Sequence, residues 1–540
     1  MILPPGVSRR DFDAALQEFR AVVGPQWVFT SEEDLDLYRD AYTPFRGDPA
    51  AERQAGAAVA PANVEQVQAI VRAANRYRTP LYAISTGRNL GYGGAAPALS
   101  GSVVVDLKRM NRVLEVNVRD AYVLVEPGVS FIDLGRYFAE HNLPFMVAAA
   151  ENGAGGPIGN ALDHGGSAVR GDNFAAVCGL EVVLPNGELL RTGSGAVANP
   201  KLWQNYRYGF GPFIEGIFSQ SNFGIVTKMG FWLERQPELI QNFAVVSSRS
   251  DDLGPLIDTV QLMRNEGLIR FSGGGSPLRS ANASTNGAIS RNLRAVDDLL
   301  RKPGGGAASE WDALSRDTGI PVSSAIGNIR GPARIVEATL EHAREVFAKI
   351  PGTTFRLGAA YRFPLDPSTV NVAERAAIGF PNLWAFQRLA VQGVSRGHYY
   401  FSPNILADAE DMLKVNLVLR KVMSDFGDEE MLNHWGWQGG SGFFPKNYTI
   451  LGDFVIKDDP GFNRRRIELF KRLVHTAAEN GWAEYRTPAG FQDVVMDAYG
   501  FNDGVLRRFN ESIKDAIDPN GVLSPGRGGI WPRRFRKAKA

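Results

Sequence analysis

Short apolar runs alternate with helical periodicity near the start of the chain. An apolar run ends at residues 59–62, helical spacing follows at 63–75, and a second run occupies 81–84. This order predicts a β-α-β unit. The preceding residues 1–55 form an N-terminal lead-in, and Ser8 is a candidate cap for its amphipathic first helix.

The strand pattern continues over the next hundred residues. Alternating apolar residues around Asn186-Gly187, within residues 179–193, predict a hairpin, because Asn-Gly suits a tight primed turn. The segment 131–140 has helical spacing. Further strands are expected at residues 102–107, 113–118 and 121–126, each bounded by glycine, asparagine or proline.

The pattern changes between about residues 236 and 484. Amphipathic helices, for instance at 335–350 and 407–426, interleave with strands and predict a second, α+β domain. Glycine-rich stretches at 272–276 and 303–307 bracket a polar segment, which we interpret as a surface excursion and a candidate border of a substrate entrance. A helix-rich C-terminal return is expected at 491–531.

Two glycine-dense stretches carry the first functional signal. One spans residues 81–97 and the other 151–166, and neither contains a cluster of charge. Glycine accepts positive φ and lets several N–H groups face one point, so that backbone alone can hold a pyrophosphate. One such loop is often an ordinary tight connection. Two of them favour a large anionic ligand.

Composition removes several alternatives. The 540 residues suggest two domains, and a formal net charge of +1 does not indicate nucleic acid. The single cysteine, Cys178, excludes an internal disulfide and a cysteine-ligated cluster, and the six histidines lack metal-ligand spacing. Since no apolar run reaches about 18 residues, we expect a soluble, cytoplasmic protein that does not enter a membrane.

Four stretches, taken together, resemble the vanillyl-alcohol oxidase family, which includes eugenol oxidase and p-cresol methylhydroxylase (PCMH). They are residues 91–97, 218–228, 484–487 and 517–521. The resemblance spans nearly the whole chain. It implies an α+β, two-domain flavoprotein in which a PCMH-type FAD-binding domain is built from the N-terminal part and the C-terminal return. The boundaries that we expect are 1–55 for the lead-in, 56–236 for the FAD-binding domain, 237–486 for an α+β cap domain and 487–540 for the return.

The resemblance also implies FAD as the cofactor, with its pyrophosphate in the two glycine cradles. His398 matches the histidine that the family's oxidases bond covalently to the flavin 8α-methyl group; read alone, it is a half-buried strand histidine. The family's helper histidine upstream of the first strand has no counterpart, since His141 is the first histidine of the chain. The other expected cofactor-binding residues are Gly87, Arg88, Asn89, Gly91, Gly93, Gly94, Gly155, Gly156, Gly159, Asn160 and Arg527.

Tyr92, Tyr485 and Arg486 match the family's phenol-binding trio. A phenol has a pKa near ~10, and two hydroxyl donors with a guanidinium stabilise its anion, which favours loss of hydride from the benzylic carbon. Read alone, Tyr92 is a loop tyrosine packed on a domain seam, and Arg486 is the partner of Glu484 in a surface ion pair.

Glu151 matches the position at which the family has an aspartate near flavin N5. Its carboxylate is a candidate to steady developing charge or to act as base toward water, and the alternative is a solvated loop carboxylate. Other matched positions depart from the family: Arg170 replaces a tyrosine, and Asn173 and Tyr448 replace histidines. We expect these departures to surround the pocket and to alter the preferred substrate.

The leading hypothesis is an FAD enzyme that oxidises para-alkyl or para-hydroxyalkyl phenols through a p-quinone methide, with molecular oxygen as acceptor and hydrogen peroxide as product. The first alternative is a dehydrogenase of the same fold that passes electrons to a cytochrome or another acceptor. The second is a nucleotide-binding or scaffolding protein, with Trp384, Trp435 and Trp437 as partner contacts. By the resemblance we expect a homo-oligomer.

Overall fold

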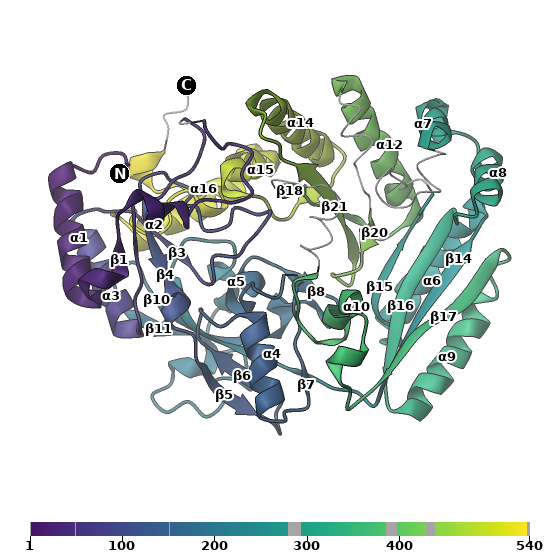
Figure 1. Cartoon of the computed structure of the whole chain (residues 1–540), viewed down its shortest axis with the longest axis horizontal. Coiled ribbons are helices and arrows are strands. Elements are labelled where there is room, and N and C mark those ends of the chain that lie inside the picture. The colour runs from purple at the N-terminus through teal and green to yellow at the C-terminus, as the bar shows by residue number, and fades with distance from the viewer. Residues whose placement is uncertain are drawn as a thin grey trace.

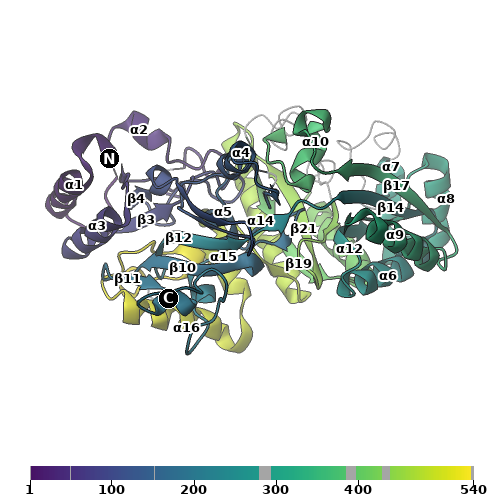
Figure 2. The same ribbon diagram turned by 90° about the horizontal axis from the view of Figure 1, so that it is seen from below.

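The computed structural model describes residues 2–48, 50–150, 152–278, 293–384, 397–427 and 438–536. Helices and strands are mixed throughout, as expected for an α+β protein (Figure 1). Helices α1 and α3 lie at one end of the molecule, and the sheet that carries α9 lies at the other (Figure 2). The domain boundaries given above stay predictions.

The first sheet has the strand order β1-β2-β4-β3. Strands β2 and β3 both run parallel to β4, so the expected β-α-β unit is present with β4 inserted between its two strands. Helix α1 begins after Ser8, whose side chain accepts a hydrogen bond from the Asp11 N–H. The elements are α1 (Arg9–Val23), β1 (Val28–Phe29), β2 (Ala57–Val59), α3 (Val64–Arg76), β3 (Leu81–Ile84) and β4 (Val103–Asp106).

The second sheet is antiparallel, in the order β11-β10-β12-β6-β5. The hairpin at Asn186-Gly187 is confirmed, since it joins β10 to β11, and Gly187 takes a φ of 83°. Apolar residues of these strands pack against α4. The elements are β5 (Val113–Asn117), β6 (Tyr122–Val125), α4 (Phe131–Glu140), β10 (Val177–Val183), β11 (Leu189–Arg191) and β12 (Ile225–Trp232).

A third sheet, in the order β15-β16-β14-β17, buries one face against α6 and α9. The glycine-rich stretch 272–276 was expected to border a surface excursion, but most of it belongs to β15, and much of the polar segment that follows lies outside the described residues. Pairing with β16 satisfies its backbone, and a Cβ at Gly274 would lie only 3.2 Å from the Tyr448 hydroxyl. The elements are β14 (Leu239–Ser247), α6 (Leu253–Asn265), β15 (Arg270–Gly275), β16 (Ser323–Gly331), α9 (Ala333–Phe347) and β17 (Thr353–Arg362).

A fourth sheet joins the cap region to the rest of the molecule. Strand β21 lies between β18 and β19, and β20 also pairs with β21. Apolar residues of α12 and α14 pack on this sheet. The elements are β18 (His398–Phe401), β19 (Pro403–Leu406), α12 (Ala409–Phe426), β20 (Gln438–Ser441), β21 (Asn447–Val455), α14 (Pro460–Glu479) and β22 (Ala483–Glu484).

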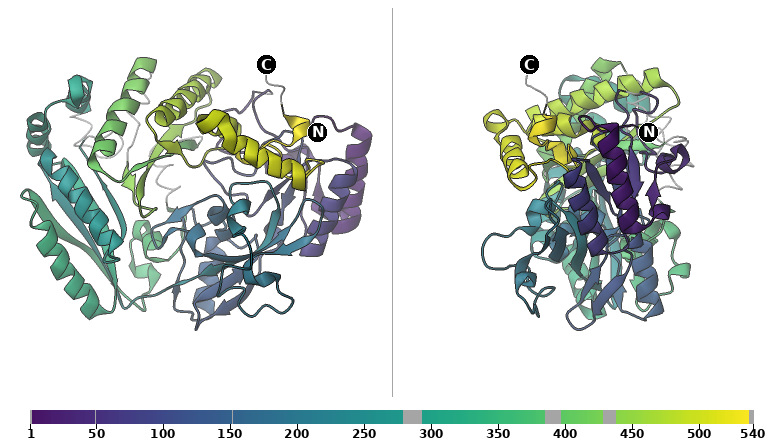
Figure 3. Two further views of the ribbon diagram at one scale, coloured as in Figure 1. Left: turned by 180° about the vertical axis from the view of Figure 1, so that it is seen from behind. Right: turned by 90° about the vertical axis from the view of Figure 1, so that its left-hand side faces the viewer.

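The C-terminal segment returns to the first sheet, as expected. Helix α16 crosses the back of the molecule towards the N-terminal helices (Figure 3). Leu523 then forms a parallel β-bridge with Leu81 of β3. The fully buried Lys514 forms a 2.7 Å ion pair with Asp518. The helices of this segment are α15 (Gln492–Ala498) and α16 (Phe501–Ile517).

The remaining elements are short, apart from two helices at the outer end of the cap region. None of the helices in the described ranges is long and apolar enough to cross a membrane. The remaining helices and strands are α2 (Glu32–Asp36), β7 (Phe145–Met146), α5 (Pro157–Leu162), β8 (Gly166–Ser167), β9 (Gly171–Asp172), β13 (Glu234–Arg235), α7 (Leu293–Arg301), α8 (Ala308–Thr318) and α10 (Val372–Arg375).

Candidate cofactor and substrate site

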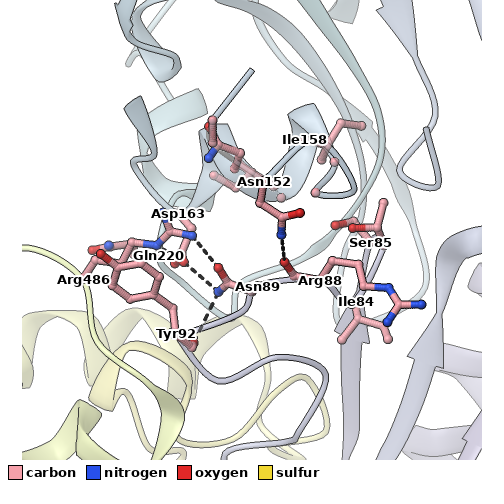
Figure 4. Close-up of a pocket in the computed structure, with 18 of the residues that line it drawn as sticks. Ile84, Ser85, Arg88, Asn89, Tyr92, Asn152, Ile158, Asp163, Gln220 and Arg486 are labelled. Atoms are coloured by element: carbon pink, nitrogen blue, oxygen red, sulfur yellow. Dashed lines mark hydrogen bonds and ion pairs between the residues drawn. The ribbon is translucent and has the colours of Figure 1, made fainter. Parts of the chain in front are cut away.

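A cavity of about 500 Å³ lies where the first two sheets, the cap region and the C-terminal return meet. Both glycine-dense stretches line it, and so do β15, β16 and the turn after β20. Figure 4 shows its polar groups, with Arg486, Asp163, Asn89 and Tyr92 gathered at one end and Arg88 at the other. One cavity therefore brings together both glycine stretches and the expected phenol-binding residues.

The glycines after β3 have two different roles. Gly87 and Gly94 line the cavity with φ values of 66° and 54°, which residues with a Cβ rarely adopt. Gly91 and Gly93 are not among the lining residues. A Cβ on Gly91 would lie 2.7 Å from the Tyr400 ring, and one on Gly93 would lie 3.1 Å from the Ala489 nitrogen. These two glycines allow close packing rather than ligand contact.

The second cradle leads into α5. Gly155, Gly156 and Gly159 line the cavity, and Gly156 is the N-cap of the helix. A Cβ at Gly159 would lie 2.5 Å from the Ser85 Oγ, so the absence of a side chain lets the two cradles touch. Two facing backbone cradles without a basic cluster suit a pyrophosphate, and the residues present fit FAD.

Tyr92, Tyr485 and Arg486 all line the cavity, although they come from distant parts of the chain. The Arg486 guanidinium lies 4.2 Å from the centre of the Tyr92 ring, and the Tyr92 hydroxyl lies 3.0 Å from the Ser402 hydroxyl. Burial raises the pKa of Tyr92 well above its usual value and also raises that of Tyr485. Both hydroxyls are therefore neutral hydrogen-bond donors at ordinary pH.

Asp163 is a site residue that sequence reasoning missed. Its carboxylate accepts a 2.7 Å hydrogen bond from Arg486 Nε and forms a second ion pair with Arg527. Burial alone would raise the pKa of Asp163, but the two guanidinium groups outweigh it and hold that pKa below its usual value. The available signal was an acidic residue, the only one besides Glu151, inside the glycine-rich stretch 151–166.

This arrangement corrects the simpler interpretation of Arg486. Its partner is Asp163, whereas the buried Glu484 accepts hydrogen bonds from the Ser402 N–H at 2.7 and 2.9 Å. In the cluster of Arg486, Arg527 and Asp163, two guanidinium groups against one carboxylate leave one net positive charge. That charge lies beside two tyrosine hydroxyls.

The two expected asparagines hold the cavity wall together. Asn89 donates to Asp163 at 3.1 Å and accepts from Arg486. Asn160 accepts a 2.7 Å hydrogen bond from Asn173, which also donates to the Ala148 carbonyl. Asn173 therefore contacts Asn160 of the cavity wall without lining the cavity itself.

His398 is buried behind the cavity wall and is not among the residues that line the cavity. Its ring lies 4.6 Å from that of Tyr400, which does line the cavity, and 5.2 Å from that of Tyr42 (centre to centre). A Cβ on Gly91 would lie 3.4 Å from its Nε2 atom. Tyr42, from the N-terminal lead-in, is thus an aromatic neighbour of this histidine.

Glu151 lies outside the described residues, as do Trp435 and Trp437. Its neighbours Ala150 and Asn152 line the cavity, and Asn152 donates a 2.6 Å hydrogen bond to the Arg88 carbonyl. Arg88 itself is exposed.

The substituted family positions do not line this cavity, in contrast to our expectation. Arg170 forms a 3.3 Å ion pair with Glu234 and, with Asn173, lines a separate space of about 30 Å³. Tyr448 is fully buried beneath β15. Arg170 is long enough to reach a partner on β13, which explains why it turns away from the cavity. Across the described residues, no group of three His, Cys, Asp or Glu side chains is placed to hold a metal ion.

A model of the FAD binding domain matches residues 55–193, the part that contains both cradles, so this region defines a flavoprotein. Over 533 residues the chain is 32% identical to the 4-cresol dehydrogenase [hydroxylating] flavoprotein subunit of Pseudomonas putida, with 98% of each chain covered. The protein belongs to the vanillyl-alcohol oxidase/p-cresol methylhydroxylase family.

Two solved structures agree over the whole chain. A substrate-bound p-cresol methylhydroxylase has a TM-score of 0.82 at 31% identity and covers 98% of this chain, with 99% of its own chain matched. An isoeugenol complex of 4-ethylphenol oxidase from Gulosibacter chungangensis has a TM-score of 0.80 at 30% identity, covering 99% and 100% of the two chains. The expected PCMH-type fold is confirmed.

Proposed function

We propose that the protein oxidises para-substituted phenols with FAD, by removing hydride from the benzylic carbon. The substrates would be 4-alkylphenols or 4-hydroxybenzylic alcohols. The observation that carries this proposal is the convergence of Tyr92, Tyr485 and Arg486 on one wall of a cavity that also contains both cradles. Relatives whose printed names include 4-cresol and 4-ethylphenol support it.

The trio would bind the phenol oxygen. The hydroxyls of Tyr92 and Tyr485 would donate to it, and the net positive charge of the arginine cluster would favour the phenolate over the phenol. Desolvation inside the cavity strengthens this attraction. The anionic oxygen pushes electron density towards the para position, so hydride leaves the benzylic carbon and a neutral p-quinone methide remains.

FAD in the two cradles would supply the hydride acceptor. Among the described residues, the cofactor contacts that we propose are those of the sequence prediction, except that Gly91 and Gly93 would act by packing. Glu151 is retained as the candidate base toward water that adds to the quinone methide.

The lining of the cavity on the cap side favours substrates whose para substituent is uncharged. Apart from Tyr400 and the proposed phenol-binding Tyr485 and Arg486, the described lining residues on this side are Gly273, Ile326, Gly442, Phe443 and Leu451, none of which carries a charge. A charged substituent would have no partner on this wall and would lose its hydration. We therefore expect short hydrocarbon or hydroxyalkyl substituents to be preferred.

We also propose that FAD is attached through His398 as an 8α-histidyl adduct. The support is the burial of His398 directly behind Tyr400, a residue of the cavity wall. The test is acid precipitation: flavin should remain in the wild-type pellet and be released from His398→Ala. Release from the wild-type protein would contradict the covalent link without affecting the proposed reaction.

Molecular oxygen is our preferred electron acceptor, with a cytochrome or another carrier as the alternative. The relatives include one named as a dehydrogenase and one named as an oxidase, so their names favour neither acceptor over the other. Hydrogen peroxide formed in a one-to-one ratio with product would support the oxidase. Turnover with an electron-accepting dye but without peroxide would support the dehydrogenase.

The decisive experiment combines cofactor content with turnover. The purified protein should be yellow and should oxidise 4-ethylphenol, and Arg486→Ala should lower kcat/KM by at least about a hundredfold, because a charged hydrogen bond is lost from a buried site. Arg136→Ala, at an exposed position on α4, is the matched control. A protein without FAD, or an Arg486→Ala variant of unchanged kcat/KM, would contradict the proposal.

Assembly into a homo-oligomer is a further part of the proposed function. Tyr206, Tyr208, Phe210 and Phe213 are exposed in one segment between β11 and β12. Contiguous exposed apolar side chains are typical of protein interfaces. Light scattering during gel filtration measures the mass, and a monomer at micromolar concentration would contradict this part.

A further inference from the structure

Ser402 lies at the break between β18 and β19 and is fully buried. Each of its polar groups contacts a different part of the site. Its hydroxyl lies 3.0 Å from the Tyr92 hydroxyl, its carbonyl accepts a 3.3 Å hydrogen bond from the Tyr485 N–H, and its N–H donates to Glu484. Ser402 therefore joins two of the three proposed phenol-binding residues.

The local structure explains why this serine is held so firmly. Strand β18 pairs with β21 up to Phe401, and pairing resumes at Pro403 and Asn404 with β22. The N–H of Ser402 lies between these two ladders, where the Glu484 carboxyl group takes the place of a backbone acceptor. Because a buried N–H without an acceptor is costly, this contact fixes the Ser402 backbone.

Glu484 has unusual surroundings for a carboxyl group. It is only 3% exposed, and burial raises its pKa well above the usual range. The hydrogen bond from the Ser402 N–H lowers this pKa, but by less than burial raises it. Retaining an acidic side chain there is unfavourable unless its hydrogen bonds matter. Glu484 is the last residue of β22, and the next two residues, Tyr485 and Arg486, line the cavity. The contact between Glu484 and Ser402 therefore helps to fix β22 and the residues that follow it.

The hydroxyl contact has a direction that matters for binding. Each hydroxyl has one proton, and either Ser402 or Tyr92 can be the donor. If Ser402 donates, the Tyr92 proton is free to point towards Tyr485 and the cavity. A phenolate oxygen accepts hydrogen bonds but donates none, so this direction is the one that suits an anionic substrate.

We propose that Ser402 is a positioning residue: its hydroxyl donates to Tyr92 and directs the Tyr92 proton at the substrate oxygen, while its carbonyl holds the strand of Tyr485. This inference rests on the proposed function, because it assigns the direction of a hydrogen bond towards a bound phenolate. It predicts that Ser402 affects the ionisation and binding of the phenol without touching the substrate.

The test measures the dissociation constant of 4-chlorophenol as a function of pH with the FAD-loaded enzyme, from the change in flavin absorbance. This phenol has no benzylic hydrogen, so it binds without turnover. Ser402→Ala should weaken binding about tenfold, the size expected for one hydrogen bond to an ionised group. The pH profile of binding should move towards higher pH by about one unit, since the anion is less stabilised.

Ser402→Thr keeps the hydroxyl and should bind 4-chlorophenol as the wild type does. Ser402→Cys has a weak donor of similar shape, and its affinity should fall between those of the serine and alanine forms. If the alanine variant does not retain FAD, the affinity of Ser402→Cys for 4-chlorophenol tests the positioning role instead. Wild-type affinity and an unshifted pH profile in FAD-loaded Ser402→Ala, or in Ser402→Cys, would overturn the inference.

The outcomes separate this inference from the proposed function. A wild-type protein that neither binds 4-chlorophenol nor oxidises 4-ethylphenol would end both proposals. A wild-type protein that does both, together with a Ser402→Ala variant of unchanged affinity and pH profile, would end only the positioning role of Ser402.

Discussion

Arg486 Nε donates a 2.7 Å hydrogen bond to Asp163 Oδ2, although the two residues are 323 positions apart in the chain. Asp163 lies within the second glycine-dense stretch, at the end of α5, and Arg486 follows β22 of the fourth sheet. The same carboxylate also pairs with Arg527 of the C-terminal return. A single acidic side chain therefore connects the cofactor cradle, the proposed phenol-binding wall and the returning chain.

Replacing Asp163 with asparagine should impair both folding and catalysis. The change leaves two buried guanidinium groups without their carboxylate, and breaking such a buried pair costs about 3–5 kcal/mol of the free energy of unfolding. Arg486 would also lose its orientation, so kcat/KM for 4-ethylphenol should fall by at least about tenfold. Chemical unfolding and steady-state kinetics measure the two effects.

Asp425→Asn is the matched control for this prediction. Asp425 is 54% exposed and pairs with Lys421 on one turn of α12. Such exposed pairs contribute about 0–1 kcal/mol, so this variant should behave as the wild type. If Asp163→Asn were no less stable than Asp425→Asn, the two guanidinium groups would not depend on that carboxylate.

Adding one methyl group at Gly159 should reduce FAD binding. The new Cβ would lie 2.5 Å from Ser85 Oγ, and relieving such a contact costs about 1–3 kcal/mol because the two cradles must separate. We expect the affinity for FAD to fall about tenfold when Gly159→Ala is introduced into a His398→Ala background, in which the flavin cannot be covalently attached. It is measured as the flavin-to-protein ratio after dialysis against defined FAD concentrations.

The double variant Gly159→Ala/Ser85→Ala provides the control. Removing the Ser85 hydroxyl leaves its Cβ as the nearest neighbour at 3.6 Å, an ordinary van der Waals distance. FAD binding should therefore recover. Equal flavin loss in the single and double variants would show that contact between the cradles is not the cause.

Asp40 should make stability fall as the solution becomes less acidic. Burial raises the pKa of this carboxyl group to about 6, although it accepts a 3.0 Å hydrogen bond from the Tyr42 N–H. Because the folded state holds the proton more tightly than the unfolded state does, the cost of a buried charge is absent below about pH 4. It grows up to about pH 6 and stays constant above that.

Asp40→Asn should remove this dependence. Unfolding of the FAD-loaded wild type and variant between pH 4 and 7 should show the variant gaining stability relative to the wild type across the window, by up to roughly 3 kcal/mol. Parallel stability curves for the two proteins would contradict the raised pKa of Asp40.

The sequence predicted those features that depend on nearby residues. The Asn186-Gly187 hairpin, the Ser8 cap and the β-α-β unit follow from local backbone preferences, and each is present. Positive φ at Gly87 and Gly94 has the same origin. Local rules did not predict β15, because a run of glycines gives no strand pattern when the Tyr448 side chain beneath it is not known.

The charge relations of the site could not be predicted locally. Asp163 and Ser402 act through Arg486 and Tyr92, and each pair is separated by more than 300 positions. Neither residue type is rare, and neither is part of a short motif. The different roles of Gly87, which lines the cavity, and Gly91, which allows close packing, could not be predicted either, because only the fold brings Tyr400 against Gly91.

The cap wall should decide how long a para substituent the cavity accepts. Phe443 lines the cavity from the turn after β20, and its side chain packs so closely on Gly166 that a Cβ there would lie 2.8 Å from it. Phe443→Ala removes a whole ring from this wall. Larger substituents then gain space, while small ones lose apolar contact, and each methylene contributes about 1–3 kcal/mol to discrimination in such pockets.

We therefore expect Phe443→Ala to raise the ratio of kcat/KM for 4-butylphenol over kcat/KM for 4-ethylphenol by about tenfold. Phe501→Ala, at a position that is 86% exposed on α16, removes the same ring from the surface and should leave the ratio unchanged. A ratio that stays constant in Phe443→Ala, with FAD content preserved, would place the para substituent against another wall of the cavity. The glycine side formed by Gly155 and Gly156 would then be the next wall to alter.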